Sequence, residues 1–197
     1  MNDDARLITP PANALNADES YGTTSPGSGK RLGENGLTYP IGFVSVAANS
    51  ANGNAVGGML VADNTGIPLE FVITTAVRPT AAQQILYGKR LKSYVAVNLC
   101  GKELLSSVKT KPAVIFVRDE TLLTLHEFTE IPVLLIRRNE ELGSAAGRPT
   151  VVPPKAHPKY AQMIDLTSLD ADMLDAFDRI EKCREVLAKN KEEYRIA

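Results

Sequence analysis

Short apolar runs separated by turn residues dominate the first part of the folded region. Residues 41–48, 56–62 and 69–77 each predict a strand, and the last of these runs is rich in β-branched residues, which suit a pleated sheet. The turn Asp63–Gly66 joins the second and third runs, and its Asn and Gly supply the positive φ values of a hairpin reversal. Because short loops join the three strands, we expect them to pair antiparallel.

A helical pattern follows this hairpin. Thr80 and Gln83 have capping-box spacing and predict a helix start, with Ile85 and Leu86 on the buried side of that helix. A second helical stretch is predicted over residues 89–108. Both helices are expected to cover a face of the sheet.

Strand and helix patterns alternate at the end of the folded region. Residues 112–119 and 131–138 are short apolar runs typical of buried strands, and residues 120–128 between them predict a short helix. A strand–helix–strand unit of this kind pairs parallel, with a right-handed crossover. We therefore expect an α/β (α+β) fold with a mixed five-stranded sheet, three antiparallel strands followed by an αβαβ unit. This order resembles a ribonuclease H-like arrangement, while a profilin-like or roadblock-like sheet stays open; architecture alone implies no activity.

Composition divides the chain into four parts. Residues 1–38 are polar and rich in Asn, Asp, Ser, Gly and Pro, so we expect a disordered tail. The mixed α/β domain is predicted over residues 39–147. Residues 148–159 are rich in proline and predict an extended, semi-stiff linker. The last part, residues 160–197, is predicted to form a C-terminal helix.

The C-terminal helix has the strongest helical pattern in the chain. Acidic residues concentrate early and basic residues late, as the helix dipole favours. Its apolar positions follow spacings of four and three, but for fewer than the three to four heptads that indicate a coiled coil. The helix either packs on its own domain or docks on a partner or second subunit. The candidate docking residues are Leu169, Met173, Ile180 and Leu187.

Charge and cysteine usage limit the class of protein. The 197 residues carry a net charge of −1, so the whole molecule exerts no strong attraction on polyanions or membranes. Cys100 and Cys183 have no metal or redox spacing, which fits a reducing compartment. Neither a signal peptide nor an apolar run of the ~20 residues that cross a bilayer is found. We expect a soluble cytoplasmic protein without a membrane partner.

The stretch Ser25–Arg31 (SPGSGKR) has the composition of a phosphate-binding loop but not its spacing. A phosphate loop needs a glycine where Thr24 stands and a hydroxyl side chain where Arg31 stands. No strand pattern precedes the stretch, and no helix pattern follows it. We interpret it as a flexible linker, and we predict no cofactor.

Catalytic residues are sparse. Two-metal hydrolysis needs several converging carboxylates, and the first predicted strand of the sheet has none. Asp119 alone stands at a strand end where a metal ligand would lie. His126 and His157 are far apart in the sequence, and Cys100 lies in an apolar segment typical of a buried thiol. We therefore predict neither a catalytic set nor a metal site.

Basic residues concentrate in the centre of the chain. From Arg78 to Arg118 there are eight bases and one acid, so this segment carries +7 and the rest of the chain −8. The segment is a solvated face, a surface for a protein partner, or a nucleic-acid surface on which tyrosines stack with bases. The candidate binding residues are Arg78, Tyr87, Lys89, Arg90, Lys92, Tyr94 and Asp119.

A Gly-Gly pair, Gly57-Gly58, lies inside the second predicted strand and marks a bulge or a close backbone approach. With the P-L-E-F strand and a Q-x-x-L-Y-G pattern, this pair resembles a set of uncharacterised bacterial proteins. The resemblance implies a bacterial source and no activity. Gln84 stands one position off that spacing. The residues that carry it are Gly57, Gly58, Pro68, Leu69, Glu70, Phe71, Gln84, Leu86, Tyr87 and Gly88.

Two functions stay open at this point. The leading hypothesis is a non-catalytic protein-interaction or accessory subunit of a bacterial cytoplasmic system. It would dock on another protein, or on a second copy of itself, through the C-terminal helix. The alternative is a nucleic-acid-binding or metal-dependent nuclease-like protein that uses the basic central segment.

Overall fold

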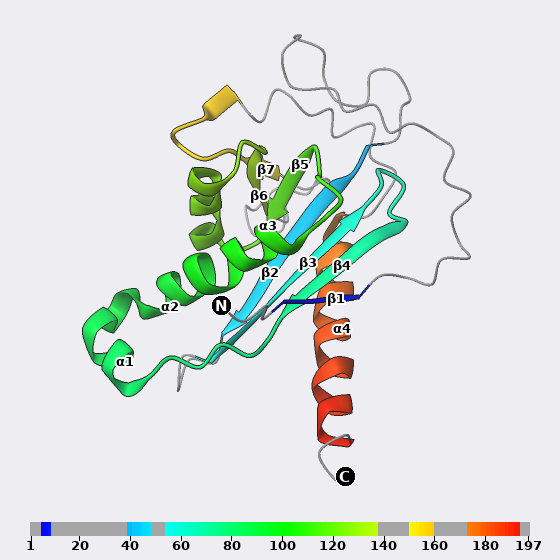
Figure 1. The fold of residues 1–197 in the computed structure, drawn as a ribbon. Coiled ribbons are helices and arrows are strands. Elements are labelled where there is room, and N and C mark those ends of the chain that lie inside the picture. Colours follow the sequence, from blue (N-terminus) through cyan, green and yellow to red (C-terminus); the bar gives the residue numbers. More distant parts are fainter. Residues whose placement is uncertain (1–4, 9–38, 49–53, 138–149, 160–172, 194–197) are drawn as a thin grey trace.

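One mixed β-sheet forms the centre of the molecule (Figure 1). The computed structural model describes residues 5–8, 39–48, 54–137, 150–159 and 173–193. Within these residues seven strands are hydrogen-bonded in the order β1-β4-β3-β2-β5-β6-β7. Their bounds are β1 (Ala5–Ile8), β2 (Ile41–Ala48), β3 (Ala55–Ala62), β4 (Pro68–Thr74), β5 (Val114–Val117), β6 (Val133–Arg137) and β7 (Thr150–Val152).

The central five strands have the order and directions that the sequence predicts. β2, β3 and β4 pair antiparallel, β5 runs parallel to β2, and β6 runs parallel to β5. Along the chain these are the third, second, first, fourth and fifth predicted strands. The predicted mixed α/β architecture is therefore confirmed.

Two short edge strands add to the predicted five. β1 pairs antiparallel with β4 and lies inside the segment predicted as a disordered tail; the rest of that tail, residues 1–4 and 9–38, is outside the described residues. β7 pairs antiparallel with β6 and lies inside the predicted linker. Strands of four and three residues give no readable periodicity. Backbone pairing at an open sheet edge recruits both, and Val152 precedes a proline, which favours extended backbone.

Short helical segments between β4 and β6 cover one face of the sheet. Val44, Met59 and Ile115 on the strands pack there against Ala96 and Leu104 of the helices. Alternation along β5 is strict, since Ile115 and Val117 face these helices while Val114 and Phe116 face the other side. The helical bounds are α1 (Ala81–Tyr87), the 3-10 helix η2 (Gly88–Arg90), α2 (Leu91–Tyr94), the π-helix η3 (Val95–Gly101), α3 (Lys102–Ser107) and the 3-10 helix η4 (Glu120–Phe128).

The second predicted helix is not α-helical throughout. Its middle, η3, is a π-helix, in which the backbone N–H of Lys102 donates to Val97 O, five residues earlier. Gly101 lets this turn lie against η4, because a Cβ there would fall 2.6 Å from Leu125 Cδ2. π-helical turns leave no mark in an apolar pattern, so the sequence pattern did not predict this one.

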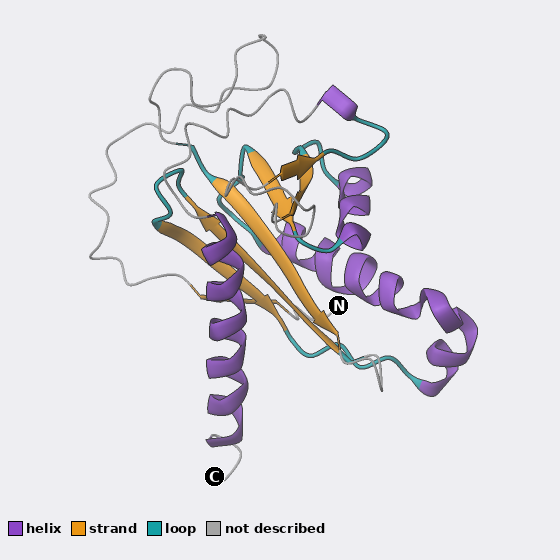
Figure 2. Cartoon of the chain, turned by 180° about the vertical axis from the view of Figure 1, so that it is seen from behind, coloured by secondary structure: helices purple, strands orange, loops and turns teal. Residues whose placement is uncertain are grey.

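Helix α4 (Met173–Glu193) covers the opposite face of the sheet (Figure 2). Ala176, Phe177 and Ile180 are buried in one cluster with the strand residues of that face. The ring of Phe177 meets Phe43 of β2 edge-on at 5.6 Å between centroids. The sheet is thus enclosed between η3, α3 and η4 on one side and α4 on the other.

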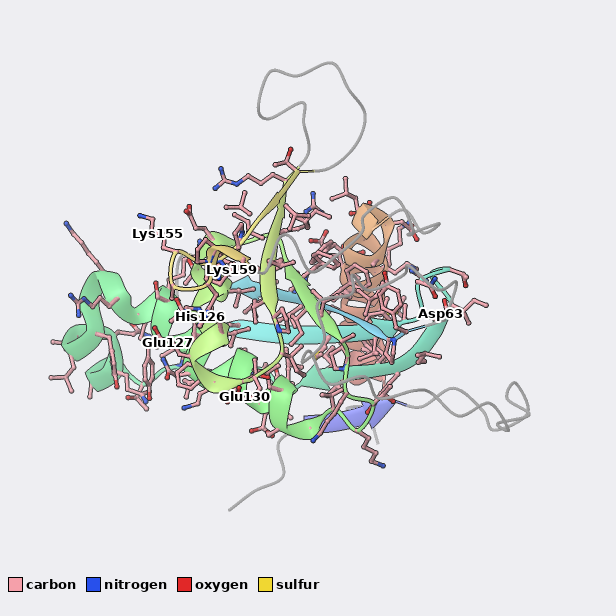
Figure 3. All side chains as sticks on the ribbon, turned by 90° about the horizontal axis from the view of Figure 1, so that it is seen from above. Asp63, His126, Glu127, Glu130, Lys155 and Lys159 are labelled. Atoms are coloured by element: carbon pink, nitrogen blue, oxygen red, sulfur yellow. The ribbon has the colours of Figure 1, made fainter. Side chains whose placement is uncertain are left out.

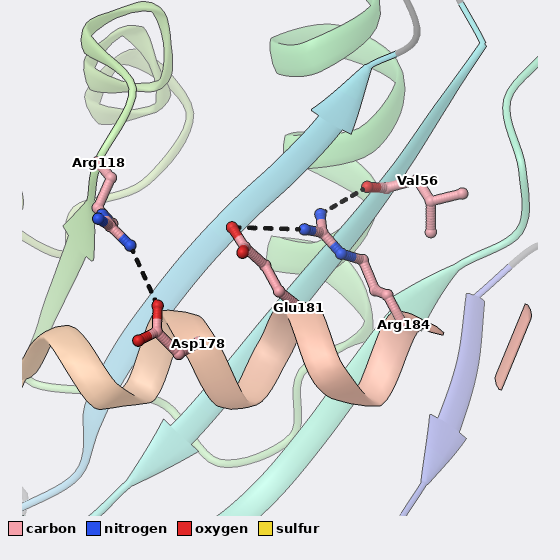
Figure 4. A network of polar contacts seen from close by, with 5 residues as sticks. All are labelled: Val56, Arg118, Asp178, Glu181 and Arg184. Atoms are coloured by element: carbon pink, nitrogen blue, oxygen red, sulfur yellow. Dashed lines mark hydrogen bonds and ion pairs between the residues drawn. The ribbon is translucent and has the colours of Figure 1, made fainter. Parts of the chain in front are cut away.

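Three arginine contacts connect α4 to the sheet and to the loops beside it. Arg184 Nη1 donates to Val56 O at 3.2 Å, and Arg118 pairs with Asp178 at 3.5 Å (Figure 4). Arg179 Nη1 donates to Gly66 O in the β3–β4 turn at 2.9 Å. Desolvation lowers the pKa of the Arg184 guanidinium from its ordinary value, against the opposing effect of Glu181. α4 is therefore an integral layer of the fold.

The Gly57-Gly58 pair makes two close approaches, one on each face of β3. A Cβ on Gly57 would lie 3.0 Å from both Cys100 Cβ and Leu104 Cδ1, and a Cβ on Gly58 would lie 2.7 Å from Ile180 Cγ2. The predicted close backbone approach is confirmed. The register irregularity of β3 with β4 lies further on, between Val61 and Ala62.

Candidate functional site

A pair of short helices, α1 and α2, projects away from the sheet (Figure 1). We call residues 78–94, which comprise α1, η2, α2 and the three residues before them, the arm. Its first helix begins as predicted: Thr80 Oγ1 accepts from Gln83 N at 3.2 Å, and Gln83 Oε1 accepts from Thr80 N at 2.8 Å. Gly88 ends α1 with a φ of 48°, a backbone conformation that suits glycine.

Two tyrosines hold the arm together. The rings of Tyr87 and Tyr94 stack at 4.1 Å between centroids with an interplanar angle of 22°. A side-chain hydrogen bond with Tyr94 raises the pKa of the Tyr87 hydroxyl, and desolvation adds to the shift. Each ring therefore covers a face of the other, whereas the nucleic-acid hypothesis expected both rings to stack on nucleobases.

The apolar side chains of α1 face solvent rather than the sheet. Ile85 is 81% exposed and Leu86 is 82% exposed, and no residue of α1 is buried. The prediction that both lie on a buried side is therefore wrong. The reason is positional, since η3 and α3 already cover the sheet face and α1 lies at the far end of the arm (Figure 1).

The arm is basic and its charges are not balanced locally. Arg78, Lys89, Arg90 and Lys92 are exposed, and the sequence from Arg78 to Gly101 contains no acid. None of these four bases forms an ion pair with any residue that the structure describes. Six of the seven predicted binding residues, all but Asp119, thus lie on one projecting element.

Asp119 lies apart from the arm and has a structural role. It stands between β5 and η4, where its side chain accepts from Thr121 N at 2.8 Å and caps the helix. The described residues contain no group of three His, Cys, Asp or Glu side chains that could hold a metal ion, so Asp119 belongs to no such group there. Its assignment to a binding surface with the arm is not supported by the geometry.

The other acids near the sheet are also engaged by backbone groups. The buried Glu70 accepts from Lys109 N at 3.0 Å and from Thr110 N at 2.7 Å, which fixes the loop after α3. Asp63 Oδ1 accepts from Thr65 N at 3.0 Å and from Ile67 N at 2.9 Å and shapes the hairpin turn. Both carboxylates therefore stabilise loops through these backbone hydrogen bonds.

The two histidines, distant in sequence, meet in the fold. The rings of His126 and His157 lie edge-to-face at 5.4 Å between centroids, on the opposite side of the molecule from Asp63 (Figure 3). His126 Nδ1 lies 2.7 Å from Leu123 O. The contact fastens the segment after β7 to η4. No sequence signal links the two positions, so sequence reasoning missed this pair.

The cysteines differ in surroundings. Cys100 is fully buried on η3, and desolvation raises the pKa of its thiol from 9.0 to about 11, partly opposed by a hydrogen bond with Thr74. The predicted burial of this thiol is confirmed, and a thiol held protonated in this way is a poor nucleophile. Cys183 lies exposed on α4.

The predicted docking residues of the C-terminal helix are not presented to solvent as a seam. Ile180 is fully buried against the sheet of its own chain, and Leu187 is half-buried. Met173 begins α4, while Leu169 lies outside the described residues. Docking through Ile180 is therefore excluded, because that side chain already belongs to the core.

Comparisons with known proteins give weak likenesses. No protein-family model and no curated protein matches the chain. Two structures of Ciona intestinalis endonuclease V, each in complex with a DNA that contains an inosine followed by a ribo-adenosine, are similar to part of it. The first has 14% identity and a TM-score of 0.34 over 54% of this chain and 49% of the other. The second has 12% identity and a TM-score of 0.31 over 77% of this chain and 57% of the other.

The chain spans about half the length of these endonuclease V structures. At such scores the likeness is too weak to assign an activity. Among the described residues, no helix combines the length and the apolar content that a membrane span requires.

Proposed function

We propose that the protein is a non-catalytic recognition module that binds a partner protein through the arm. The observation that carries the proposal is the exposure of Ile85 and Leu86, both above 80%, on a helix without buried residues. This proposal keeps a protein partner but moves the docking element from the C-terminal helix to the arm, because α4 is packed on the sheet.

Exposed apolar side chains on a projecting element are costly unless a partner covers them. Burying an Ile and a Leu would contribute about 3–6 kcal/mol together, before the entropic costs of association. Single exposed apolar residues need no explanation, but two neighbouring ones that are both above 80% exposed, beside the basic residues of the arm, support an interaction surface. The adjacent unpaired bases then supply orientation and speed of encounter.

The arrangement of acids supports recognition over catalysis. Asp63, Glu70 and Asp119 each accept hydrogen bonds from backbone N–H groups of a loop or helix end. A hydrolytic two-metal site needs several carboxylates that converge on two cations about 4 Å apart. These three acids stand instead at three separate structural positions.

A nucleic acid is the second candidate, favoured by the four basic residues of the arm, which form no ion pair with a residue that the structure describes. Phosphate contacts by these residues would give binding that falls steeply with salt. The two tyrosines support this candidate less, because their rings already stack on each other. Retention on heparin that survives at physiological salt, and that is lost in a K89E/R90E/K92E variant, would favour it.

Site-specific photo-crosslinking in cells of the source organism tests the proposal. A photoreactive residue in place of Ala82, one α-helical turn before Leu86, is expected to form an adduct with a protein. The same residue in place of Ile67, which is 58% exposed in the β3–β4 turn, serves as the matched control and is expected to give none. The adduct should disappear when Lys89, Arg90 and Lys92 are changed to Glu. An adduct with nucleic acid, or no adduct at position 82, would exclude the proposed function.

A further inference from the structure

We infer that the arm recognises an acidic protein segment that presents apolar side chains. This inference rests on the proposed function and specifies the chemistry of the partner. It follows from two properties that coincide on the arm: exposed aliphatic side chains, and basic residues without local counter-charges.

Charge sets the first requirement on the partner. Arg78, Lys89, Arg90 and Lys92 stand in a segment that contains no acid, and none forms an ion pair with a described residue. An acidic bound molecule would therefore find these four basic side chains without a competing ion pair from the described residues. Each exposed pair is worth only about 0.2–1 kcal/mol, so charge mainly steers the encounter and makes binding depend on salt.

Aliphatic exposure sets the second requirement. Ile85 and Leu86 are consecutive residues, and consecutive side chains on a helix point about 100° apart. They therefore border an edge of α1 rather than forming one flat patch. A peptide segment can place its own apolar side chains on both sides of such an edge, whereas phosphates offer only charge.

Other occupants fit less well. A second copy that docked arm to arm would bring like charges together, and these would repel. Nucleic acid would pair with the basic residues of the arm but would leave the apolar side chains of Ile85 and Leu86 exposed. The rings of Tyr87 and Tyr94 cover each other and are not free to stack on nucleobases. An anionic membrane surface would meet both requirements, but α1 has only 7 residues, a short apolar face for a membrane-surface helix.

Fluorescence anisotropy with defined peptides tests the inference. The probe is a labelled amphipathic peptide with Glu and Leu side chains at helical spacing, and two matched peptides carry Gln for Glu or Ala for Leu. The full chain is expected to bind the first peptide at least about tenfold more tightly than either matched peptide, with affinity that falls as salt rises. Equal binding of the three peptides, or no binding, would overturn the inference.

Variants of the full chain locate the binding surface. The changes Lys89→Glu with Arg90→Glu and Lys92→Glu, and separately Ile85→Ser with Leu86→Ser, are each expected to weaken peptide binding at least about tenfold. Lys182→Glu and Val186→Ser, at exposed positions of α4, are the matched controls and should leave it unchanged. Circular dichroism confirms that each variant is folded, which the exposure of the arm residues leads us to expect.

Two further probes identify other occupants. Vesicles that contain phosphatidylserine, and single-stranded RNA, are titrated with the same variants. If the arm variants lose binding to one of these while the peptides bind weakly, the acidic-peptide inference is wrong. A protein adduct at position 82 with no peptide selectivity would overturn the partner chemistry alone, whereas the absence of a protein adduct would overturn the proposed function as well.

Discussion

Gly58 of β3 and Ile180 of α4 approach so closely that a Cβ atom on Gly58 would lie 2.7 Å from Ile180 Cγ2. Glycine in a strand costs conformational entropy and packs nothing, so its presence needs a reason. The reason is the depth at which α4 lies on the sheet. This contact explains why α4 packs as a layer on its own domain, although its apolar seam could also have docked on a partner.

Gly58→Ala is expected to lower the free energy of unfolding by about 1–3 kcal/mol, because the added methyl group overpacks the contact. Ile180 is β-branched and cannot rotate Cγ2 away freely. Urea denaturation measures the loss. In an Ile180→Ala background, which lacks Cγ2, the same change should cost less; strict additivity of the two changes would contradict the close contact.

The two cysteines are expected to react at different stages. At about pH 8, a disulfide reagent such as Ellman's should modify Cys183 rapidly and Cys100 only after unfolding. A Cys183→Ser variant should then show no reactive thiol in the native state. Rapid modification of both thiols in the folded chain would contradict the burial of Cys100.

Burial of Cys100 also predicts a loss of stability at high pH. Its pKa is 9.0 as the ordinary value and about 11 in the fold, so the folded chain keeps this proton after the unfolded chain has released it. The contribution is complete below pH 9 and is lost as the pH rises towards about 11, by up to about 2–3 kcal/mol at 1.36 kcal/mol per unit. Unfolding free energies at several pH values measure it. The Cys100→Ala variant should not show this fall in the free energy of unfolding. Parallel pH profiles for the variant and the wild type would contradict the prediction.

Asp119 is expected to matter as a helix cap and not as a metal ligand. Asp119→Ala should lower stability by about 1 kcal/mol, while Asp119→Asn should be nearly neutral, since Asn caps as well as Asp. Thermal denaturation with and without Mg²⁺ or Mn²⁺ measures both effects. Stabilisation of the wild type by metal that is lost in Asp119→Asn would instead support the nuclease-like alternative.

Tyr87 is expected to order the arm without supporting the core. Tyr87→Ala should speed amide hydrogen exchange in residues 85–92 and leave the global free energy of unfolding nearly unchanged, because the arm is exposed. Tyr87→Phe keeps the ring stack and loses only the hydroxyl contact with Tyr94, so its effect should be smaller. Equal exchange in all three proteins would show that the ring pair does not hold the arm.

The sheet was predictable because each central strand is short, apolar and bounded by turn residues. The run of Val114–Val117, for example, has side chains buried on both faces, which its continuous apolar sequence indicates. The capping box at Thr80 was visible for a similar reason, since its hydrogen bonds are local. β1 and β7 were not predictable, because pairing with a distant strand creates them.

The candidate site was predictable in its charge but not in its shape. Lys89, Arg90 and Lys92 stand out in the sequence, and they lie on one exposed element. Ile85 and Leu86 were assigned to a buried face because apolar helix positions usually pack on the nearest sheet. The face was already occupied by η3 and α3, a fact of tertiary packing that periodicity does not encode. The His126–His157 contact is invisible to sequence for the same reason.

The π-helical bonding of η3 also governs the direction in which the arm points. A turn closed between residues five apart holds one residue more than an α-helical turn, and each α-helical residue adds about 100° of rotation. Removing a single residue from Val95–Gly101 would therefore swing the arm roughly a quarter-turn about its own axis while the sheet stayed in place. The direction of the arm relative to the sheet thus depends on the backbone bonding of a segment whose side chains are largely buried in the interior.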